Sequence, residues 1–217
     1  MTNEERKQIF YDTKKVAYTK TTKLYKENDI LDSANPIEII WSENTVKTIF
    51  KLNGKIAALN FADPFRPGGL VEQGIKTQEE DLCRSSTLYN SLIKEENIIE
   101  FYDYNMRKFG STDRIIYSEN VLFFKDENCV STPFPKWCDI ITCAAPLPNE
   151  NLSIKELKNR MRRIIQAAAL NKNDYLILGK WGCGAFCGDW ELYSEMWNEV
   201  IAELEGNNVR NTSNKQM

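Results

Sequence analysis

Four short apolar runs constrain the fold of this chain more than any other feature. They are residues 37–41 (IEIIW), 55–61 (KIAALNF), 139–143 (DIITC) and 175–178 (YLIL). Short apolar runs of this kind are typical of strands that are buried on both faces of a sheet. Because amphipathic helices are predicted between them, the sequence predicts an α/β fold whose mixed, largely parallel sheet is covered on both faces, with three layers in all.

Helix start signals accompany these strands. Two pairs, Thr2 with Glu5 and Ser153 with Glu156, have the spacing of a capping box. The predicted helices run from Thr2 to about Tyr25, over 78–93, from Ser153 onward, and from Asp189 as N-cap to Gly206. Two further strands are predicted at 114–117 and 121–124, whereas residues 97–113 give no clear pattern.

Length and composition indicate one domain. The 217 residues are 42% apolar and 27% charged, which suits a globular protein with a substantial core. We expect a single domain over residues 1–206 and a disordered tail over 207–217, because the tail lacks apolar content. The net charge of −3 gives no basic field that would attract a nucleic-acid backbone or a membrane, and we expect a monomer. No apolar run approaches the ~20 residues that a membrane span needs.

The sequence contains no histidine and six cysteines. The absence of histidine excludes Ser-His-Asp and Cys-His catalysis and every zinc site that uses histidine. No CxxC motif and no signal peptide occur, so we expect reduced thiols in an intracellular protein, cytoplasmic or nuclear. Cys183 and Cys187 are only a weak hint of a metal site, and neither a metal nor a cofactor is expected.

The segment 59–80 joins an apolar strand to a glycine turn and an acidic helix start. Glycines let a loop backbone approach a ligand closely. Without histidine, a general acid or base must be a carboxylate, Lys, Tyr or Cys, which favours Glu79 and Glu80. The alternative is structural: Thr77 and Glu80 have capping-box spacing, so Glu80 could serve only the backbone N–H of Thr77. Spacing alone leaves both interpretations open.

A second glycine-rich loop, 179–189 (GKWGCGAFCGD), lies between the last apolar strand and the last helix. Backbone N–H groups of such a loop at a helix N-terminus suit a phosphate or diphosphate. The loop is neither a dinucleotide-binding fingerprint nor a Walker A motif, and a plain tight turn is the alternative. Since ligands collect beyond the carboxyl ends of strands in α/β sheets, the two loops together favour a ligand site.

These motifs resemble a known family. The run NFADPFRPGGLVEQGIKTQEEDLCR is similar to the signature of microbial-type poly(ADP-ribose) glycohydrolases, in which three glycines precede Gln-Glu-Glu, and WGCGAF (181–186) resembles their diphosphate-binding loop. VLFFKD (121–126), ITCAAPLPN (141–149) and LKNRMRRIIQAAA (157–169) occur in the matching order, so the resemblance covers most of residues 5–205. It implies a macrodomain-like fold and a metal-independent glycosidase that acts on ADP-ribose or poly(ADP-ribose) attached to proteins.

The resemblance also implies residue roles. Glu80 would be the catalytic acid, and Glu79 would position the ribose. The substrate-binding residues that it implies are Asn60, Asp63, Gly68, Gly69, Leu70, Gln78, Gly182, Cys183, Gly184, Ala185 and Phe186. Two positions depart from the family pattern: Leu70 replaces the third glycine, and Asp63 replaces an expected Asn. Leu70 is expected to crowd the substrate, and Asp63 is expected to bring an acceptor-only carboxylate close to the ribose and diphosphate.

Three activities remain open on this basis. The first is hydrolysis of the ribose–ribose O-glycosidic bond of poly(ADP-ribose), with Glu80 as general acid and then base. The second is an ADP-ribose reader with impaired chemistry, which the Leu70 and Asp63 departures would explain. The third is a hydrolase for mono-ADP-ribose on protein or nucleic acid.

Overall fold

A seven-stranded mixed sheet forms the centre of the molecule. The computed structural model describes residues 1–16, 18, 20–33, 35–206 and 208–211. The strands are β1 (Thr22–Tyr25), β2 (Ile37–Trp41), β3 (Ile56–Phe61), β4 (Ile115–Lys125), β5 (Ser131–Cys143), β6 (Tyr175–Leu178) and β7 (Val209–Asn211). Their order across the sheet is β1-β4-β5-β3-β6-β2-β7. The β1–β4 and β4–β5 pairs are antiparallel and the others are parallel.

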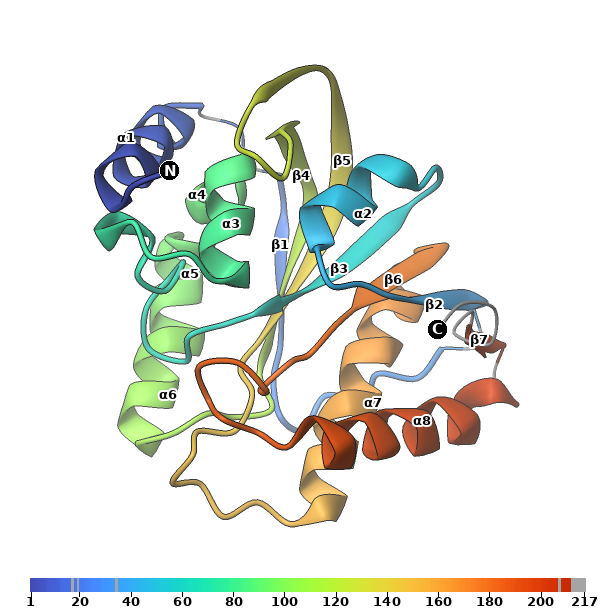
Figure 1. The fold of residues 1–217 in the computed structure, drawn as a ribbon. Coiled ribbons are helices and arrows are strands. Elements are labelled where there is room, and N and C mark those ends of the chain that lie inside the picture. Colours follow the sequence, from blue (N-terminus) through green and yellow to red (C-terminus); the bar gives the residue numbers. More distant parts are fainter. Residues whose placement is uncertain (17, 19, 34, 207, 212–217) are drawn as a thin grey trace.

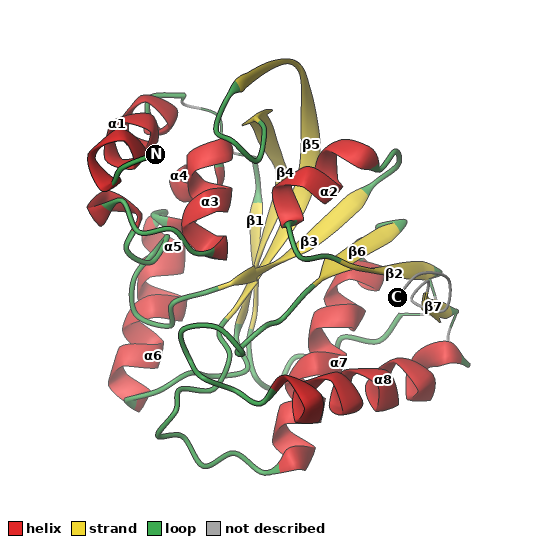
Figure 2. Ribbon diagram, viewed as in Figure 1, coloured by secondary structure: helices red, strands yellow, loops and turns green. Residues whose placement is uncertain are grey.

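Helices cover both faces of the sheet (Figures 1 and 2). They are α1 (Asn3–Lys14), α2 (Thr45–Lys51), the 3-10 helix η1 (Val71–Gln73), α3 (Gln78–Ser85), α4 (Leu88–Leu92), α5 (Glu95–Asn97), the π-helix η2 (Ile98–Tyr102), α6 (Asp103–Lys108), α7 (Ile154–Leu170) and α8 (Trp190–Glu205). Two separate apolar clusters result. One joins the sheet to α7 and α8, and the other joins it to α1–α4 and η2. The predicted three-layer α/β/α fold is confirmed.

Several boundaries differ from the predictions because strand pairing overrides helix propensity. The first helix ends at Lys14, and residues 22–25 form β1, which pairs with β4. The helix predicted over 78–93 is broken in two, because Ser86 forms a β-bridge to Phe123 and Thr87 exchanges hydrogen bonds with Leu122.

The remaining differences concern the bounds of strands and the segment that had no prediction. The two short strands at 114–124 are one strand, β4, with an irregularity between Ser118 and Val121, and β5 begins at Ser131 and not at 139. The unassigned segment 97–113 contains η2 and α6. Val209–Asn211 pair with β2, which corrects the expected disorder for these residues; positions 207 and 212–217 lie outside the described residues.

The parallel strands bring the two glycine loops together. β3 lies between β5 and β6, with Phe61 opposite Cys143 and Ala58 opposite Ile177. Parallel neighbours end at the same edge of a sheet. The loops that follow β3 and β6 therefore emerge side by side at that edge.

Candidate active site

Gln78 fixes the start of α3 against the end of β3. Its side-chain oxygen accepts the Phe61 N–H at 2.9 Å, and its side-chain nitrogen donates to the Leu59 carbonyl at 2.8 Å. The amide thus continues the strand's hydrogen-bonding pattern. As a result, Glu79 and Glu80, which follow Gln78, lie at the carboxyl end of β3.

The Glu79 carboxylate is buried, with 3% of the residue exposed. The side-chain amide of Asn60 donates to Oε1 at 3.0 Å, and the Asp63 N–H donates to Oε2 at 2.8 Å. Burial raises the pKa of the Glu79 carboxyl well above its ordinary value; these two hydrogen bonds oppose the shift, and the neighbouring Glu80 adds to it. The two predicted residues Asn60 and Glu79 are therefore joined by a direct hydrogen bond.

Glu80 is also buried but has different partners. The Leu70 N–H donates to Oε1 at 2.9 Å, and the Thr77 hydroxyl contacts Oε2. Burial raises the pKa of Glu80, and the Leu70 hydrogen bond partly opposes this. The sequence left open that Glu80 serves only the backbone N–H of Thr77. In the structure its carboxylate accepts from the Leu70 N–H and contacts the Thr77 hydroxyl, and the side chain of Thr77 makes no cap hydrogen bond. The carboxylate is thus held between the glycine loop and the helix start.

Gly68 and Gly69 are required by the backbone of the first loop. Their φ angles are +70° and +60°, which lie in the left-handed region. A Cβ at Gly69 would lie 2.5 Å from Glu80 Oε1 and 3.2 Å from Glu79 Oε2, so only glycine lets the loop touch both carboxylates. Leu70 has φ −106°, a conformation open to any residue, and contributes its N–H to Glu80.

Asp63 uses its side chain within the loop. Its Oδ1 accepts the N–H groups of Phe65 and Arg66 at 2.8 and 3.0 Å. An aspartate that bonds the backbone two and three residues on stabilises a turn. The departure at position 63 therefore has a local structural role, while the backbone of Asp63 serves Glu79.

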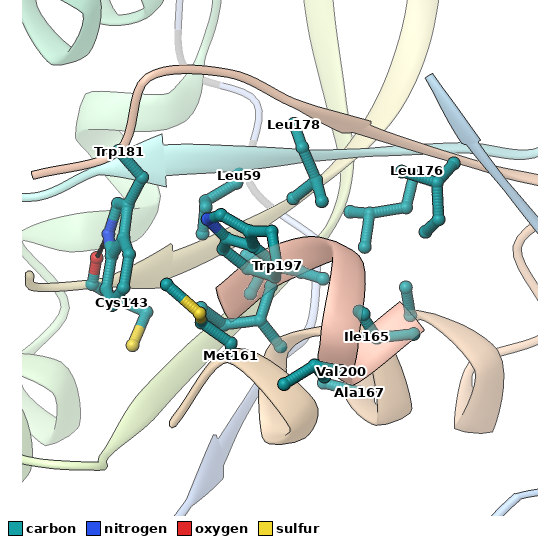
Figure 3. Packing of buried hydrophobic residues seen from close by; sticks show 14 of the residues in the cluster. Leu59, Cys143, Met161, Ile165, Ala167, Leu176, Leu178, Trp181, Trp197 and Val200 are labelled. Atoms are coloured by element: carbon teal, nitrogen blue, oxygen red, sulfur yellow. Dashed lines mark hydrogen bonds between the residues drawn. The ribbon is translucent and has the colours of Figure 1, made fainter. Parts of the chain in front are cut away.

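The second loop is anchored by a buried tryptophan. Trp181 is fully buried, and its indole N–H donates to the Cys143 carbonyl at 3.0 Å, a bond drawn in Figure 3. Trp181 also packs against Trp197 and Tyr193 of α8. The next residue, Gly182, has φ +79°, and a Cβ there would meet Tyr193 at 2.9 Å. The aromatic core thus fixes the base of this loop.

The far part of the second loop is open. A Cβ at Gly184 would meet nothing within 4 Å. The Cys183 N–H donates to the Lys180 carbonyl, which corrects its expected availability to a ligand in this conformation. Within the described chain, the N–H groups of Gly184, Ala185 and Phe186 have no hydrogen-bond partner. These three N–H groups could donate to a bound anion without breaking an existing hydrogen bond.

A cavity of about 300 Å³ joins the two loops. It is lined by Phe61, Thr77, Gln78, Ala145, Lys180, Gly182, Cys183, Gly184, Ala185 and Phe186. Glu79 and Glu80 follow Gln78 in α3 and do not line this cavity themselves. Four other predicted residues contact their carboxylates: Asn60, Asp63, Gly69 and Leu70. Gly68 lies instead beside Tyr89 and Cys83. The sequence interpretation missed Phe61, Thr77, Ala145 and Lys180 as lining residues. All four lie in segments that the sequence singled out, 59–80, 141–149 and 179–189, but none was named as a binding residue.

A second cavity, of about 240 Å³, lies at the opposite edge of the sheet, where β3 begins. Its buried carboxylate, Asp139, already accepts hydrogen bonds from Tyr117, Asn173 and the Asn120 N–H. Because that carboxylate is satisfied within the protein, the cavity between the glycine loops is the candidate active site.

The described residues contain no group of three or more Cys, Asp or Glu side chains arranged to hold a metal ion. None of their helices combines the length and apolar character that crossing a membrane requires.

Solved structures of other proteins share this fold. The fold matches poly(ADP-ribose) glycohydrolase (PARG) from Thermomonospora curvata bound to the inhibitor ADP-HPD, with 26% identity, a TM-score of 0.75 and coverage of 93% of this chain and 86% of that one. It also matches PARG from Deinococcus radiodurans in complex with ADP-ribose, with 29% identity, a TM-score of 0.72 and coverage of 93% and 89%. The fold is therefore that of the PARG class.

The family assignment comes from the sequence. The family model for the microbial-type PARG catalytic domain matches residues 1–126, a segment that contains β3, both glutamates and all of β4. The chain belongs to this family. No curated protein matches the chain significantly.

Proposed function

We propose that this protein hydrolyses the ribose–ribose O-glycosidic bond of poly(ADP-ribose) and releases ADP-ribose. The observation that carries the proposal is the buried Glu79–Glu80 pair beside a cavity whose other wall is a loop with unpaired N–H groups. A protonated carboxylic acid and an anion-binding loop are the two parts that cleavage next to a diphosphate requires.

Glu80 is the general acid in this proposal. Burial favours its protonated form, and the acid donates its proton to the leaving oxygen as the bond to the anomeric carbon breaks. The developing oxocarbenium-like centre is stabilised in part by the substrate's own diphosphate. Water then adds to the anomeric carbon and returns a proton to Glu80. Both glutamates come from one helix start, unlike the two flanking carboxylates of most glycosidases.

The remaining residues bind the substrate. Glu79, held by Asn60 and the Asp63 N–H, orients the ribose hydroxyls. The N–H groups of Gly184, Ala185 and Phe186 hold the diphosphate, and Lys180 adds a positive charge at the cavity wall. Phe186 covers the ribose. Gly69 and Leu70 lie against the carboxylates and, with Gly68, shape the space around the distal ribose.

We further propose that the enzyme works as a monomer and without a metal ion. Two alternatives concern the same site: an ADP-ribose reader with impaired chemistry, and a hydrolase of mono-ADP-ribose on protein or nucleic acid. The turn that Asp63 Oδ1 stabilises supports working chemistry over a reader, because that oxygen is already engaged by the Phe65 and Arg66 N–H groups.

The decisive experiment compares wild type with Glu80→Gln on labelled poly(ADP-ribose) and on a mono-modified protein. The amide can still accept the Leu70 N–H, so the variant should bind ADP-ribose and lose turnover by ~10²-fold or more, the scale of a missing general acid. A chelator should leave wild-type turnover unchanged. Near-normal hydrolysis by Glu80→Gln would refute the role of Glu80. Binding without turnover in wild type would identify a reader, and release from the mono-modified substrate alone would identify the third activity.

A further inference from the structure

Thr77 links the buried Glu80 to the cavity. It stands at the N-cap position of α3, with extended backbone angles, yet its hydroxyl contacts Glu80 Oε2 and caps no backbone N–H. Glu80 is 4% exposed, whereas Thr77 is exposed and lines the cavity. The hydroxyl is therefore placed between the carboxyl group and the space that the substrate would fill.

The two oxygens of Glu80 have chemically different partners. Oε1 accepts the Leu70 N–H at 2.9 Å, and a backbone N–H can only donate. A proton on Oε1 would compete with that donor for the lone pairs of the oxygen and weaken the bond. Oε2 faces the Thr77 hydroxyl, which can either donate or accept. Of the two oxygens, Oε2 is therefore the one whose partner can accept a hydrogen bond from the protonated carboxyl group.

We infer that Thr77 is a positioning residue that assigns the transferable proton of Glu80 to Oε2 and adapts its hydroxyl to both charge states of that carboxyl. The inference rests on the proposed function and deepens it. In the free acid, Oε2–H donates to Thr77 Oγ1. In the reaction, the proton moves from Oε2 to the leaving oxygen, which also takes the electron pair of the broken C–O bond.

The hydroxyl then reverses its direction. Once Oε2 is negative, the Thr77 O–H donates to it and stabilises the carboxylate that must act as base. Water adds its oxygen to the anomeric carbon and gives one proton back to Oε2, so the acid is restored and the atoms balance. A hydroxyl serves both half-reactions because it is donor and acceptor at once.

Other charged groups face the same carboxyl and must be separated from the effect of Thr77. Glu79, Asp81, Cys83 and Arg84 of α3 interact with Glu80. Asp63 from the first loop and Tyr102 of η2 interact with the adjacent Glu79. None of these residues changes when Thr77 alone is replaced, so a difference between Thr77 variants reports the hydroxyl.

The test compares Thr77→Val, which keeps the branched shape, with Thr77→Ser, which keeps the hydroxyl. The ¹³Cδ resonance of Glu80 is titrated in full-length protein labelled at glutamate and is assigned by its absence in Glu80→Gln. A hydroxyl donates more strongly to a carboxylate than it accepts from the acid, so its loss disfavours the charged form. The Glu80 pKa should therefore rise in Thr77→Val and stay near the wild-type value in Thr77→Ser.

Kinetics on poly(ADP-ribose) give a second readout. Thr77→Val should lower kcat by about tenfold, the effect of one lost hydrogen bond to a charged group, with little change in KM. The alkaline limb of the kcat–pH profile, where the acid loses its proton, should move to higher pH. Thr77→Ser should restore both features, which a purely structural role of the β-branched side chain would not allow.

An unchanged Glu80 titration in Thr77→Val would overturn the inference, as would a Thr77→Ser variant that behaves like Thr77→Val. Wild type that binds ADP-ribose but releases none from polymer would contradict the proposed function instead. In that case the NMR titration would still decide whether Thr77 controls the proton on Glu80.

Discussion

The two glycine loops differ in how their backbone N–H groups are used: the first loop donates to protein carboxylates, whereas the second leaves several donors unpaired. The first loop is held on every side. Arg6 of α1 donates to the Gly74 carbonyl at 2.5 Å, Leu70 donates to Glu80, and Gly69 touches both carboxylates. The second loop is anchored at its base by Trp181 and by the bond from the Gly188 N–H to the Gly182 carbonyl, and one turn bond, from the Cys187 N–H to the Gly184 carbonyl, crosses its far part. Its far end, from Gly184 to Phe186, leaves its N–H groups unpaired.

This difference matches two different chemical tasks. A general acid needs a fixed position and a pKa that burial can raise, so its surroundings must be closed. An anion site needs unpaired donors that the ligand can reach, so its surroundings must be open. Glycine serves both loops for separate reasons. In the first it permits contact with side chains, and at position 184 it leaves space.

The strongest test of the closed loop is Gly69→Ala. The new Cβ would lie 2.5 Å from Glu80 Oε1 in a backbone with φ +60°, so the Leu70–Glu80 contact should be lost. We expect turnover to fall by ~10²-fold or more, as for loss of a positioned acid. The left-handed backbone should also cost roughly 1–2 kcal/mol of stability. Turnover on polymer and thermal unfolding measure the two effects.

Gly54→Ala is the matched control for that variant. Gly54 also has positive φ, +124°, and its nearest neighbour is also a carboxylate oxygen, that of Asp174, 2.7 Å from the added Cβ. It lies at the opposite edge of the sheet. This control should lose stability and keep its turnover. Equal losses of turnover in both variants would show that backbone strain alone, and not the carboxylate contact, explains Gly69→Ala.

A smaller effect is expected in the open loop. Gly184→Ala should leave stability unchanged, because its Cβ meets no protein atom within 4 Å. If ADP-ribose lies against this backbone, binding should weaken by about 1–3 kcal/mol, the usual cost of a lost buried hydrogen bond. Gly206→Ala, whose Cβ also meets nothing within 4 Å, is the control. Calorimetry that finds wild-type affinity in Gly184→Ala would remove the loop from the site.

The smallest effect is expected for Leu70→Gly. The crowding expected from sequence predicts faster hydrolysis when the side chain is removed. The structure favours a modest decrease, because Leu70 already has an ordinary φ and its N–H must be held on Glu80. Added backbone freedom should cost roughly 0.5–1 kcal/mol of stability. A time course of ADP-ribose release distinguishes the two outcomes, and an increase would restore the crowding explanation.

Much of the fold was visible in the sequence wherever burial and local geometry agree. The apolar runs 37–41 and 175–178 became β2 and β6 with those bounds, and the Ser153–Glu156 capping box begins α7. Boundaries failed where a distant strand decided them. Residues 22–25 pair with β4, and Ser86 forms a β-bridge to Phe123 that ends α3. These contacts join distant segments, so no local sequence pattern indicates them.

The sequence by itself determined which residues could do chemistry: without histidine, the Gln78-Glu79-Glu80 segment and two glycine loops were the remaining candidates, and residue types alone supply that information. Only the tertiary structure decided how they are used. Glu80, a possible cap of Thr77 by spacing, is a buried carboxyl group that the Leu70 N–H, ten residues away in the chain, reaches. The physical reason is that hydrogen-bond partners and burial, which set a carboxyl group's pKa, depend on chain segments that meet only on folding.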